Sequence, residues 1–249
     1  MYTGLLYHDI MNIQDFPHPS LTVDVVLFTI MDDDLKVLLV QRSVEPFANM
    51  WTLPGGFVNH HQSMEAAALQ KLKEKTNVDQ IYLEQLYTFG DPGRDPRTHV
   101  VTVAYYALVS SENFELKPSK AVNEVRWHSI YELPQLGFDH EQILGYALER
   151  LRNKLSYTTV GSQLLPEKFT FPELCRMYEV ILDRKIDKRN FRKKVALLDI
   201  LEETDETTQK FSKKPARLYR FKHSDIVDLP QTSLQGLQSK LSQSLAGKG

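Results

Sequence analysis

Two strand-like runs at residues 21–42 constrain the fold of this chain more than any other feature. The runs LTVDVVLFTI and LKVLLVQR are apolar and rich in β-branched residues, and the polar turn Met31-Asp32-Asp33-Asp34 separates them. This pattern predicts a β-hairpin. We therefore expect a sheet to begin near residue 21, after an N-terminal extension of residues 1–20.

Further strands and two helices are expected downstream. Strand-like runs cover residues 81–89, 100–109 and 124–128, with loops rich in Gly and Pro between them. Residues 63–76 are helical in pattern and place Met64, Ala67, Ala68, Leu69 and Leu72 on one side. A second helix over residues 139–154 carries a stripe at helical spacing: Ile143, Leu144, Ala147, Leu148 and Leu151. Together these elements predict an α/β domain over residues 21–155.

A second domain is expected after residues 156–169, which lack a period and are interpreted as a linker. The sequence Thr170-Phe171-Pro172-Glu173 is a capping-box pattern and starts a helix with an apolar stripe from Leu174 to Leu182. Asp187 can cap another helix that carries Phe191, Val195 and Leu198. A hairpin is indicated after this helix. Its strands are residues 201–204 and 216–221, and a polar basic stretch that ends at Lys213-Lys214-Pro215 connects them. Helix, turn, helix, hairpin predicts an α+β winged helix-turn-helix domain over residues 170–223, with a flexible tail at 224–249.

Composition limits where such a chain acts. The single Cys175 excludes an internal disulfide framework, and no segment approaches the ~20 apolar residues that a membrane span needs. We expect a soluble, cytoplasmic protein with no membrane partner. Residues 1–169 hold 14 Lys and Arg against 21 Asp and Glu, whereas residues 170–222 hold 14 against 9. This asymmetry indicates that the C-terminal domain faces a polyanion, or simply has a solvated charged surface.

The run Trp51-Thr52-Leu53-Pro54-Gly55-Gly56-Phe57-Val58, followed by a helix, resembles the start of the Nudix box, G-x5-E-x7-R-E-U-x-E-E-x-G-U with U apolar. The resemblance covers about residues 20–154 and implies a Nudix α/β/α sandwich with a mixed sheet. Four box positions are kept: Gly56, Leu72, Glu74 and Val78. The others are replaced: Gln62, Gln70, Lys71, Lys75 and Asn77.

These replacements bear on catalysis. Cleavage of a nucleoside diphosphate needs Mg²⁺, which carboxylate oxygens hold. Lys71 and Lys75 put ammonium groups where the family binds the metal, and Glu74 alone is a poor site. We therefore expect no catalytic residues, no metal site and no enzymatic activity. Lys71 and Lys75 either offset pyrophosphate charge directly or form a solvated helix face.

The surrounding loops resemble those of ADP-ribose-type Nudix proteins. The resemblance rests on the run from Phe89 to Arg97, on the strand that ends at Tyr105, and on Phe138-Asp139-His140. Guanidinium groups suit paired oxyanions and aromatic rings stack on bases, although any single arginine can equally form a structural salt bridge. Asp139-His140 can instead be a helix cap with a buried histidine. The predicted effector-binding residues are Arg42, Gly55, Gly56, Phe57, Lys71, Glu74, Lys75, Phe89, Arg94, Arg97, Tyr105, Asp139 and His140.

Basic residues gather on the second short helix and the hairpin of the C-terminal domain. With Phe191 and Val195 in the core, the rest of the helix is exposed and can meet phosphates and base edges in a major groove. A basic helix alone is also typical of an ordinary solvated surface. The predicted DNA-binding residues are Lys188, Arg189, Asn190, Arg192, Lys193, Lys194, Lys213, Lys214 and Arg217.

The segments 187–194 and 215–219 resemble the C-terminal domain of the Nudix-related, NrtR-like transcriptional regulators. The resemblance implies a bacterial repressor of NAD metabolism that senses ADP-ribose or a related nucleotide, requires no cofactor, and binds a palindromic operator in double-stranded DNA as a homodimer. A sister branch of the family responds to sugars. Two other hypotheses stay open: an active ADP-ribose pyrophosphatase with an accessory basic domain, and a protein-interaction module without a DNA role.

Overall fold

The computed structural model of the protein describes residues 18–76, 81–112, 122–209 and 215–230. The predicted hairpin forms from β1 (Ser20–Met31) and β2 (Asp34–Arg42), which pair antiparallel. Asp32 and Asp33 connect them with φ of 52° and 60°. Positive φ at both central residues is the geometry of a type I′ hairpin turn, and aspartate is one of the few residues that adopts it readily. The hairpin prediction is confirmed.

The large sheet is mixed, and its central strand is β1. Its strand order is β3-β2-β1-β6-β5, with β4 paired to β1 and β7 to β2. β1 and β6 (Val100–Leu108) are parallel, whereas β5 (Tyr82–Phe89) and β7 (Val122–Ser129) join antiparallel to β6 and β2. Two short strands that the sequence pattern did not predict, β3 (Trp51–Thr52) and β4 (Gly55–Phe57), extend the sheet.

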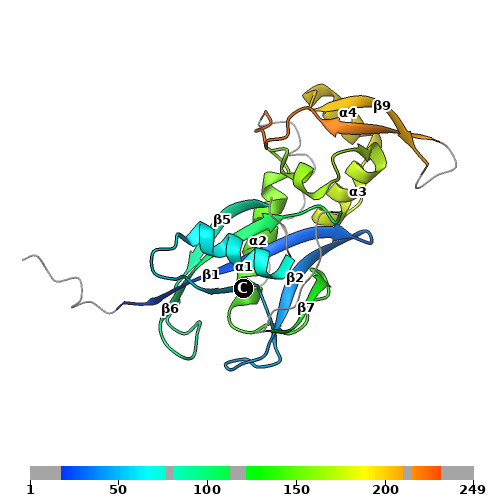
Figure 1. The fold of residues 1–249 in the computed structure, drawn as a ribbon. Coiled ribbons are helices and arrows are strands. Elements are labelled where there is room, and N and C mark those ends of the chain that lie inside the picture. The colour runs from blue at the N-terminus through cyan, green and yellow to red at the C-terminus, as the bar shows by residue number, and fades with distance from the viewer. Residues whose placement is uncertain (1–17, 77–80, 113–121, 210–214, 231–249) are drawn as a thin grey trace, which may run out of the picture.

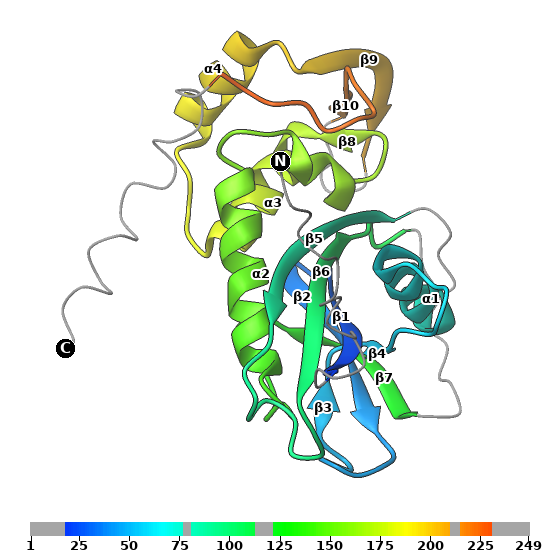
Figure 2. The ribbon, with the colours of Figure 1, turned by 90° about the vertical axis from the view of Figure 1, so that its left-hand side faces the viewer.

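Apolar side chains alternate between the two faces of β1, and a helix covers each face of the sheet. Val23, Val25 and Leu27 face the helix α1 (Met64–Thr76), and Val26 and Phe28 face α2 (His140–Lys154). Figures 1 and 2 show the two helices on opposite faces of the sheet. This is the α/β/α sandwich predicted from the Nudix resemblance.

The stripe predicted for α1 is only partly correct. Ala67, Ala68 and Leu72 are buried, but Met64 and Leu69 are exposed. Leu69 follows the buried Ala68 directly, and one residue turns a helix by about 100°. Its side chain therefore leaves the buried face.

The C-terminal domain has the predicted order of elements. It comprises β8 (Phe169–Thr170), α3 (Phe171–Leu182), α4 (Lys188–Leu198), β9 (Leu201–Thr208) and β10 (Ala216–Phe221). The capping box of Thr170 and Glu173 is formed, and Asp187 caps α4 by accepting from the N–H groups of Arg189 and Asn190. The first hairpin strand was predicted to end at residue 204 and extends to Thr208, because Thr207 and Thr208 pair with Arg217 and Ala216.

The connecting segments are packed against the rest of the protein. In the segment expected as a linker, residues 160–164 form the 3₁₀ helix η2 (Val160–Leu164), and Val160 and Leu164 are buried. The flexible tail expected from residue 224 is ordered over its first residues. Thr159 N–H donates to Val227 O and Leu229 is buried, so backbone pairing and apolar contact hold this stretch. Within the described ranges no helix is long and apolar enough to cross a membrane.

The two domains share one hydrophobic core. A single cluster of buried side chains runs from the α2 face of the sheet through η2 into α3 and α4. Three residues of the N-terminal domain also contact α3, two of them at its C-terminus. Tyr131 Oη donates to Val180 O (2.5 Å), Arg152 Nε donates to Ile181 O (2.8 Å), and Asp33 accepts from Arg176. The last carbonyls of a helix lack intrahelical partners, so Tyr131 and Arg152 supply what the C-terminus of α3 needs.

Candidate functional site

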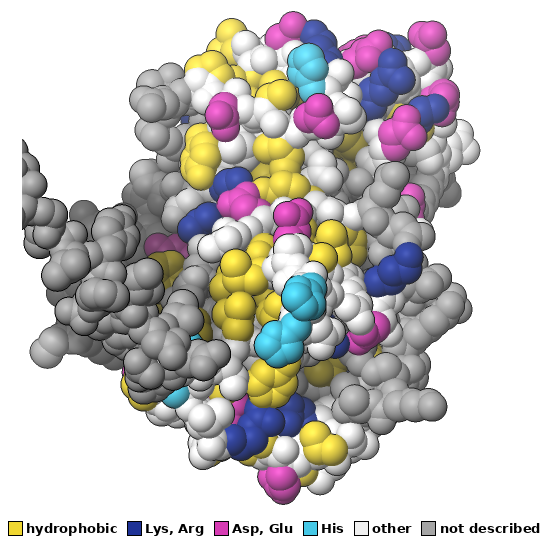
Figure 3. Space-filling model, turned by 60° about the vertical axis from the view of Figure 1, so that its left-hand side comes forward, with side chains coloured by type: hydrophobic (Ala, Val, Ile, Leu, Met, Phe, Trp, Pro, Cys, Tyr) yellow, Lys and Arg dark blue, Asp and Glu magenta, His cyan; other side chains and the backbone are white. Residues whose placement is uncertain are grey.

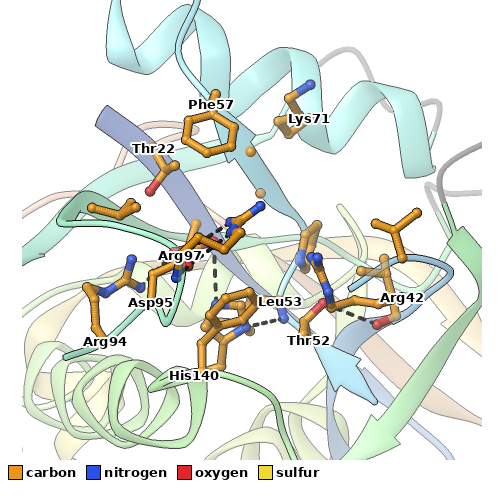
Figure 4. A pocket seen from close by; sticks show the side chains of 18 of the residues that line it. Thr22, Arg42, Thr52, Leu53, Phe57, Lys71, Arg94, Asp95, Arg97 and His140 are labelled. Atoms are coloured by element: carbon orange, nitrogen blue, oxygen red, sulfur yellow. Dashed lines mark hydrogen bonds and ion pairs between the residues drawn. The ribbon is translucent and has the colours of Figure 1, made fainter. Parts of the chain in front are cut away.

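A cavity of about 270 Å³ lies between the Gly55-Gly56 turn, the end of β2 and the N-terminus of α2. Figure 4 shows Phe57 and Lys71 on its α1 side, His140 on the α2 side, and Arg97 between Arg94 and Arg42. Nine of the predicted effector-binding residues line it: Arg42, Gly55, Gly56, Phe57, Lys71, Glu74, Arg94, Arg97 and His140.

Three other predicted residues, Phe89, Tyr105 and Asp139, do not line the cavity. Tyr105 is buried on the opposite face of the sheet, in the core that α1 covers. Phe89 is buried beneath Tyr87 and Tyr146, with ring centroids 5.4 and 5.5 Å away. Asp139 stands behind the cavity wall, where it binds Arg94. The side chain of Lys75 lies outside the described part of the chain.

Arg94 is buried and held by two carboxylates. Its Nε and Nη2 donate to the two oxygens of Asp139 (2.8 and 2.7 Å), and Nη2 lies 3.4 Å from Asp24 Oδ2. Burial opposes the charge of the guanidinium, but the hydrogen bonds to Asp139 and the charge of Asp24 outweigh it and raise the pKa of Arg94. Arg94 therefore stays charged, although Asp24 and Asp139 already balance that charge.

His140 is buried and neutral. Its Nδ1 accepts a hydrogen bond from the N–H of Leu53 (2.8 Å), so the ring proton is on Nε2, which faces Asp24 Oδ1 at 3.6 Å. Burial lowers the pKa of His140. Asp139 makes no side-chain cap to α2, so the cap suggested by the sequence is not formed. His140 instead fixes the β3–β4 loop to the helix.

Arg42 and Arg97 are the cations best placed to bind an anion. Arg97 is paired with Asp95, is 43% exposed, and lies over the Phe57 ring with its guanidinium carbon 5.6 Å from the centroid. Arg42 donates through Nε to Pro46 O (2.7 Å), and its guanidinium lies over the Phe138 ring. Burial and then the charge of Arg97 lower the pKa of Arg42. A phosphate between the two guanidinium groups would relieve this repulsion.

The residues at the Nudix box positions do not fit a metal ion. Gln62 donates to Gln70 (2.8 Å), Gln70 donates to Glu74 (2.9 Å), and Lys71 Nζ lies 3.6 Å from the other oxygen of Glu74. The stem of Lys71 also occupies the space beside Gly56, where a Cβ would lie only 3.0 Å from Cε. Across the described ranges no group of three His, Cys, Asp or Glu side chains is placed to hold a metal. The amide of Gln62 and the ammonium group of Lys71 thus stand where the box has carboxylates, the ligands that Mg²⁺ prefers.

Some pocket residues were missed by the sequence reasoning. Asp24 contacts both Arg94 and His140, and Asp95 fixes Arg97. The signal for Asp24 was present, since a charged residue in the middle of an apolar strand run needs a partner. Phe138 was noted only within a motif, yet it stacks under Arg42.

The exposed face of α4 carries cations. Phe191 and Val195 are buried, and Lys188, Arg189, Asn190 and Lys193 are exposed. Arg192 lies at the flank of the helix, and its guanidinium carbon is 4.1 Å from the centroid of the Phe171 ring. The stacking holds the planar group in place while its edges stay free to donate. Lys194 is partly buried.

The hairpin of this domain is less basic than expected. β9 has the sequence LEETDETT, and two of its three glutamates pair with arginines of β10. Arg217 binds Glu203 and Arg220 binds Glu202, and the upper right of Figure 3 shows basic and acidic groups side by side on the hairpin. Of the predicted wing residues, Lys213 and Lys214 lie outside the described residues.

Fold and site define a class: a winged-helix DNA-binding protein joined to a Nudix domain in which Gln62 and Lys71 stand at carboxylate positions of the box. Family models agree. Residues 161–221 match the NrtR DNA-binding winged helix domain and residues 20–148 match the NUDIX domain.

Individual relatives point the same way. The chain is 39% identical over 215 residues to the "ADPR responsive transcriptional repressor NtrR" of Acinetobacter baylyi, covering 85% of each chain. The crystal structure of Shewanella oneidensis NrtR with a 27mer DNA is similar with a TM-score of 0.72 and 43% identity, over 81% of this chain and 93% of that one. The NUDIX domain of that protein, solved with ADP ribose, matches with a TM-score of 0.50 and 44% identity, over 57% of this chain and 94% of that domain. An ADP-ribose pyrophosphatase of Methanocaldococcus jannaschii is 32% identical over 55% of this chain and 77% of its own length. The protein belongs to the NrtR family of transcriptional regulators.

Proposed function

We propose that this protein is a transcriptional repressor of NAD metabolism whose Nudix domain, residues 21–155, binds ADP-ribose or a related nucleotide without hydrolysing it. The winged helix, residues 170–223, binds a palindromic operator in double-stranded DNA as a homodimer in the cytoplasm. Residues 1–20 and 224–249 are extensions, and 156–169 connect the domains. The names of the Acinetobacter and Shewanella relatives support both ligands.

One observation carries the proposal: the cavity is lined by cationic side chains, although carboxylates that bind the metal in the Nudix box are replaced. Arg42, Arg97 and Lys71 line the same cavity as Phe57. The two arginines and Lys71 bind the two phosphates, and Phe57 stacks on the adenine. Arg94 orients the loop that carries Arg97. Lys71 supplies the positive charge that Mg²⁺ supplies in a Nudix enzyme, so binding requires no metal or other cofactor.

The same substitutions argue against catalysis. Hydrolysis of the pyrophosphate requires a metal to activate water and neutralise phosphate charge. Gln62 and Lys71 provide no carboxylate for it, and the box carboxylate of Glu74 is already engaged by Gln70 and Lys71. The resemblance to an ADP-ribose pyrophosphatase keeps the enzyme hypothesis testable. A sugar effector is the other alternative within the family.

Calorimetry in EDTA tests the proposal. ADP-ribose should bind with one site per protomer, and ribose or arabinose should give no heat. An assay with Mg²⁺ and ADP-ribose should release no more AMP than a Glu74→Gln control. Metal-dependent turnover well above that control would favour the enzyme instead.

DNA binding is tested by fluorescence anisotropy on operator-containing and scrambled duplexes, with and without ADP-ribose. A higher affinity for the operator and a shift caused by ADP-ribose are expected. Equal affinity for both duplexes would contradict the regulator.

A further inference from the structure

The hairpin of the winged helix carries two arginine–glutamate pairs on opposite faces. Glu203 lies directly across from Tyr219, and Glu202 lies across from Arg220. Because successive side chains of a strand point to opposite faces, the pairs Arg217–Glu203 and Arg220–Glu202 face in opposite directions. The two pairs are chemically alike and differ in what surrounds them.

The Glu203 face points towards the helices. Tyr219 shares this face, and its ring meets Phe171 at a centroid distance of 6.4 Å. Glu203 accepts from the Tyr219 hydroxyl (3.1 Å) as well as from Arg217. Phe171 also stacks under Arg192 of α4. Glu203 therefore lies in the same cluster as an arginine of the DNA-reading helix.

Glu203 is an ionised carboxylate at this position. Hydrogen bonds from Arg217 and Tyr219 lower the pKa of Glu203, and the positive charge of Arg192 lowers it further. Any DNA that contacts Arg192 therefore brings its negatively charged phosphates towards the negatively charged carboxylate of Glu203. Arg217 must also exchange its carboxylate partner for a phosphate.

We propose that Glu203 limits the sequence-independent DNA affinity of the protein, by holding Arg217 in an ion pair and placing a negative charge beside Arg192. This inference rests on the DNA-binding function proposed above. Phosphate contacts supply affinity without sequence information, so a carboxylate next to them weakens binding to every duplex alike. Less of the regulator is then held on the rest of the chromosome.

Glu202 provides a matched control. It pairs with Arg220 on the other face, beside Gln163, Pro166 and Glu167 and away from α4. Replacing either glutamate by glutamine removes one negative charge and one cross-strand pair from the same strand. Only the Glu203 change alters the cluster around Arg192.

The experiment compares the full-length wild type, Glu203→Gln and Glu202→Gln on operator and scrambled duplexes at several salt concentrations. Glu203→Gln should bind both duplexes about 5- to 10-fold more tightly near 0.1 M salt, with a salt dependence steeper by about one counterion per protomer. Glu202→Gln should match the wild type. Thermal melting confirms that each variant is folded.

Each other outcome overturns the inference. An unchanged affinity for Glu203→Gln would mean that this face of the hairpin does not contact the DNA. Weaker binding would mean that Glu203 instead helps to position Arg217 or contacts a base. A gain on the operator alone contradicts a sequence-independent role, and an equal gain for Glu202→Gln reduces the effect to net charge. A wild type that binds no duplex rejects the regulator itself, which separates that failure from this one.

Discussion

The guanidinium of Arg94 donates two hydrogen bonds of 2.8 and 2.7 Å to the carboxylate of Asp139, although the two residues are 45 positions apart in the chain. The pair ties the loop after β5 to the N-terminus of α2. Asp139 itself does not line the cavity, so its contribution to ligand binding passes through Arg94.

Asp139→Asn should destabilise the protein and weaken effector binding together. The substitution leaves the buried Arg94 with only Asp24 at 3.4 Å as an anionic partner. Removing one member of a buried pair typically costs several kcal/mol, and because Asn still accepts one hydrogen bond we expect about 1–3 kcal/mol. Urea denaturation measures this. Glu124→Gln, which breaks an exposed pair with Arg126, should cost less than about 1 kcal/mol.

Arg42→Ala should weaken ADP-ribose binding about tenfold or more with little loss of stability. Arg42 lines the cavity, and a charged hydrogen bond to phosphate contributes about 1.5–3 kcal/mol. Calorimetry gives the affinity. Arg126→Ala is the matched control, because Arg126 is outside the cavity lining and lies over Trp51. Equal losses for both variants would show that general charge, not the pocket, determines affinity.

Tyr131→Phe and Arg152→Ala should uncouple the two domains. Both residues bind carbonyls at the C-terminus of α3 from the N-terminal domain. Helix α2, which runs along the sheet towards the C-terminal domain in Figure 2, begins at His140 and carries Arg152 in its last turn. We expect each ligand to bind with nearly normal affinity and the effect of ADP-ribose on DNA affinity to shrink. Arg150→Ala should keep the coupling, because Arg150 donates to Glu84 and to Leu86 O within the N-terminal domain. Unchanged coupling in the first two variants would exclude this route.

Arg189→Ala and Arg192→Ala should weaken DNA binding in different ways. Arg189 is on the side of α4 opposite the buried Phe191, whereas Arg192 is stacked at the flank over Phe171. Loss of Arg189 should relax sequence preference by about 1–3 kcal/mol at particular base pairs. Loss of Arg192 should weaken binding to all duplexes and flatten the salt dependence by about one counterion. Titrations against single-base operator variants distinguish these patterns.

Stability should fall as the pH is lowered from 7.5 to 5.5. Burial lowers the pKa of His140 and of His128, so the unfolded chain takes up protons near pH 6.5 before the folded protein does. The stabilisation from the neutral rings is complete above this pH and is lost as the pH falls through it. His140→Asn keeps an acceptor for the Leu53 N–H and should show a shallower slope. Melting curves at several pH values test this, and an unchanged slope in His140→Asn and His128→Gln would assign the effect to other groups.

The sequence determined the features that depend on near neighbours. The Asp32-Asp33 turn, the Thr170–Glu173 capping box and the Asp187 cap all involve groups within four residues, so residue type and spacing suffice to predict them. The replacement of box carboxylates by Gln62, Lys71 and Lys75 was equally visible. The order of helices and strands in both domains followed from such local signals, and the family resemblance supplied nine of the residues that line the cavity.

Only the tertiary structure decided which distant groups meet. Three such contacts join residues that are 14 to 87 positions apart in the sequence: Arg94 with Asp139, His140 with Leu53, and Arg217 with Glu203. Each contact depends on how the strands are aligned and how the helices pack. The placement of Tyr105 shows the physical reason. A strand shifted by one residue exchanges its two faces, and only pairing within the assembled sheet, here β6 beside β1, turned Tyr105 away from the cavity and into the opposite core.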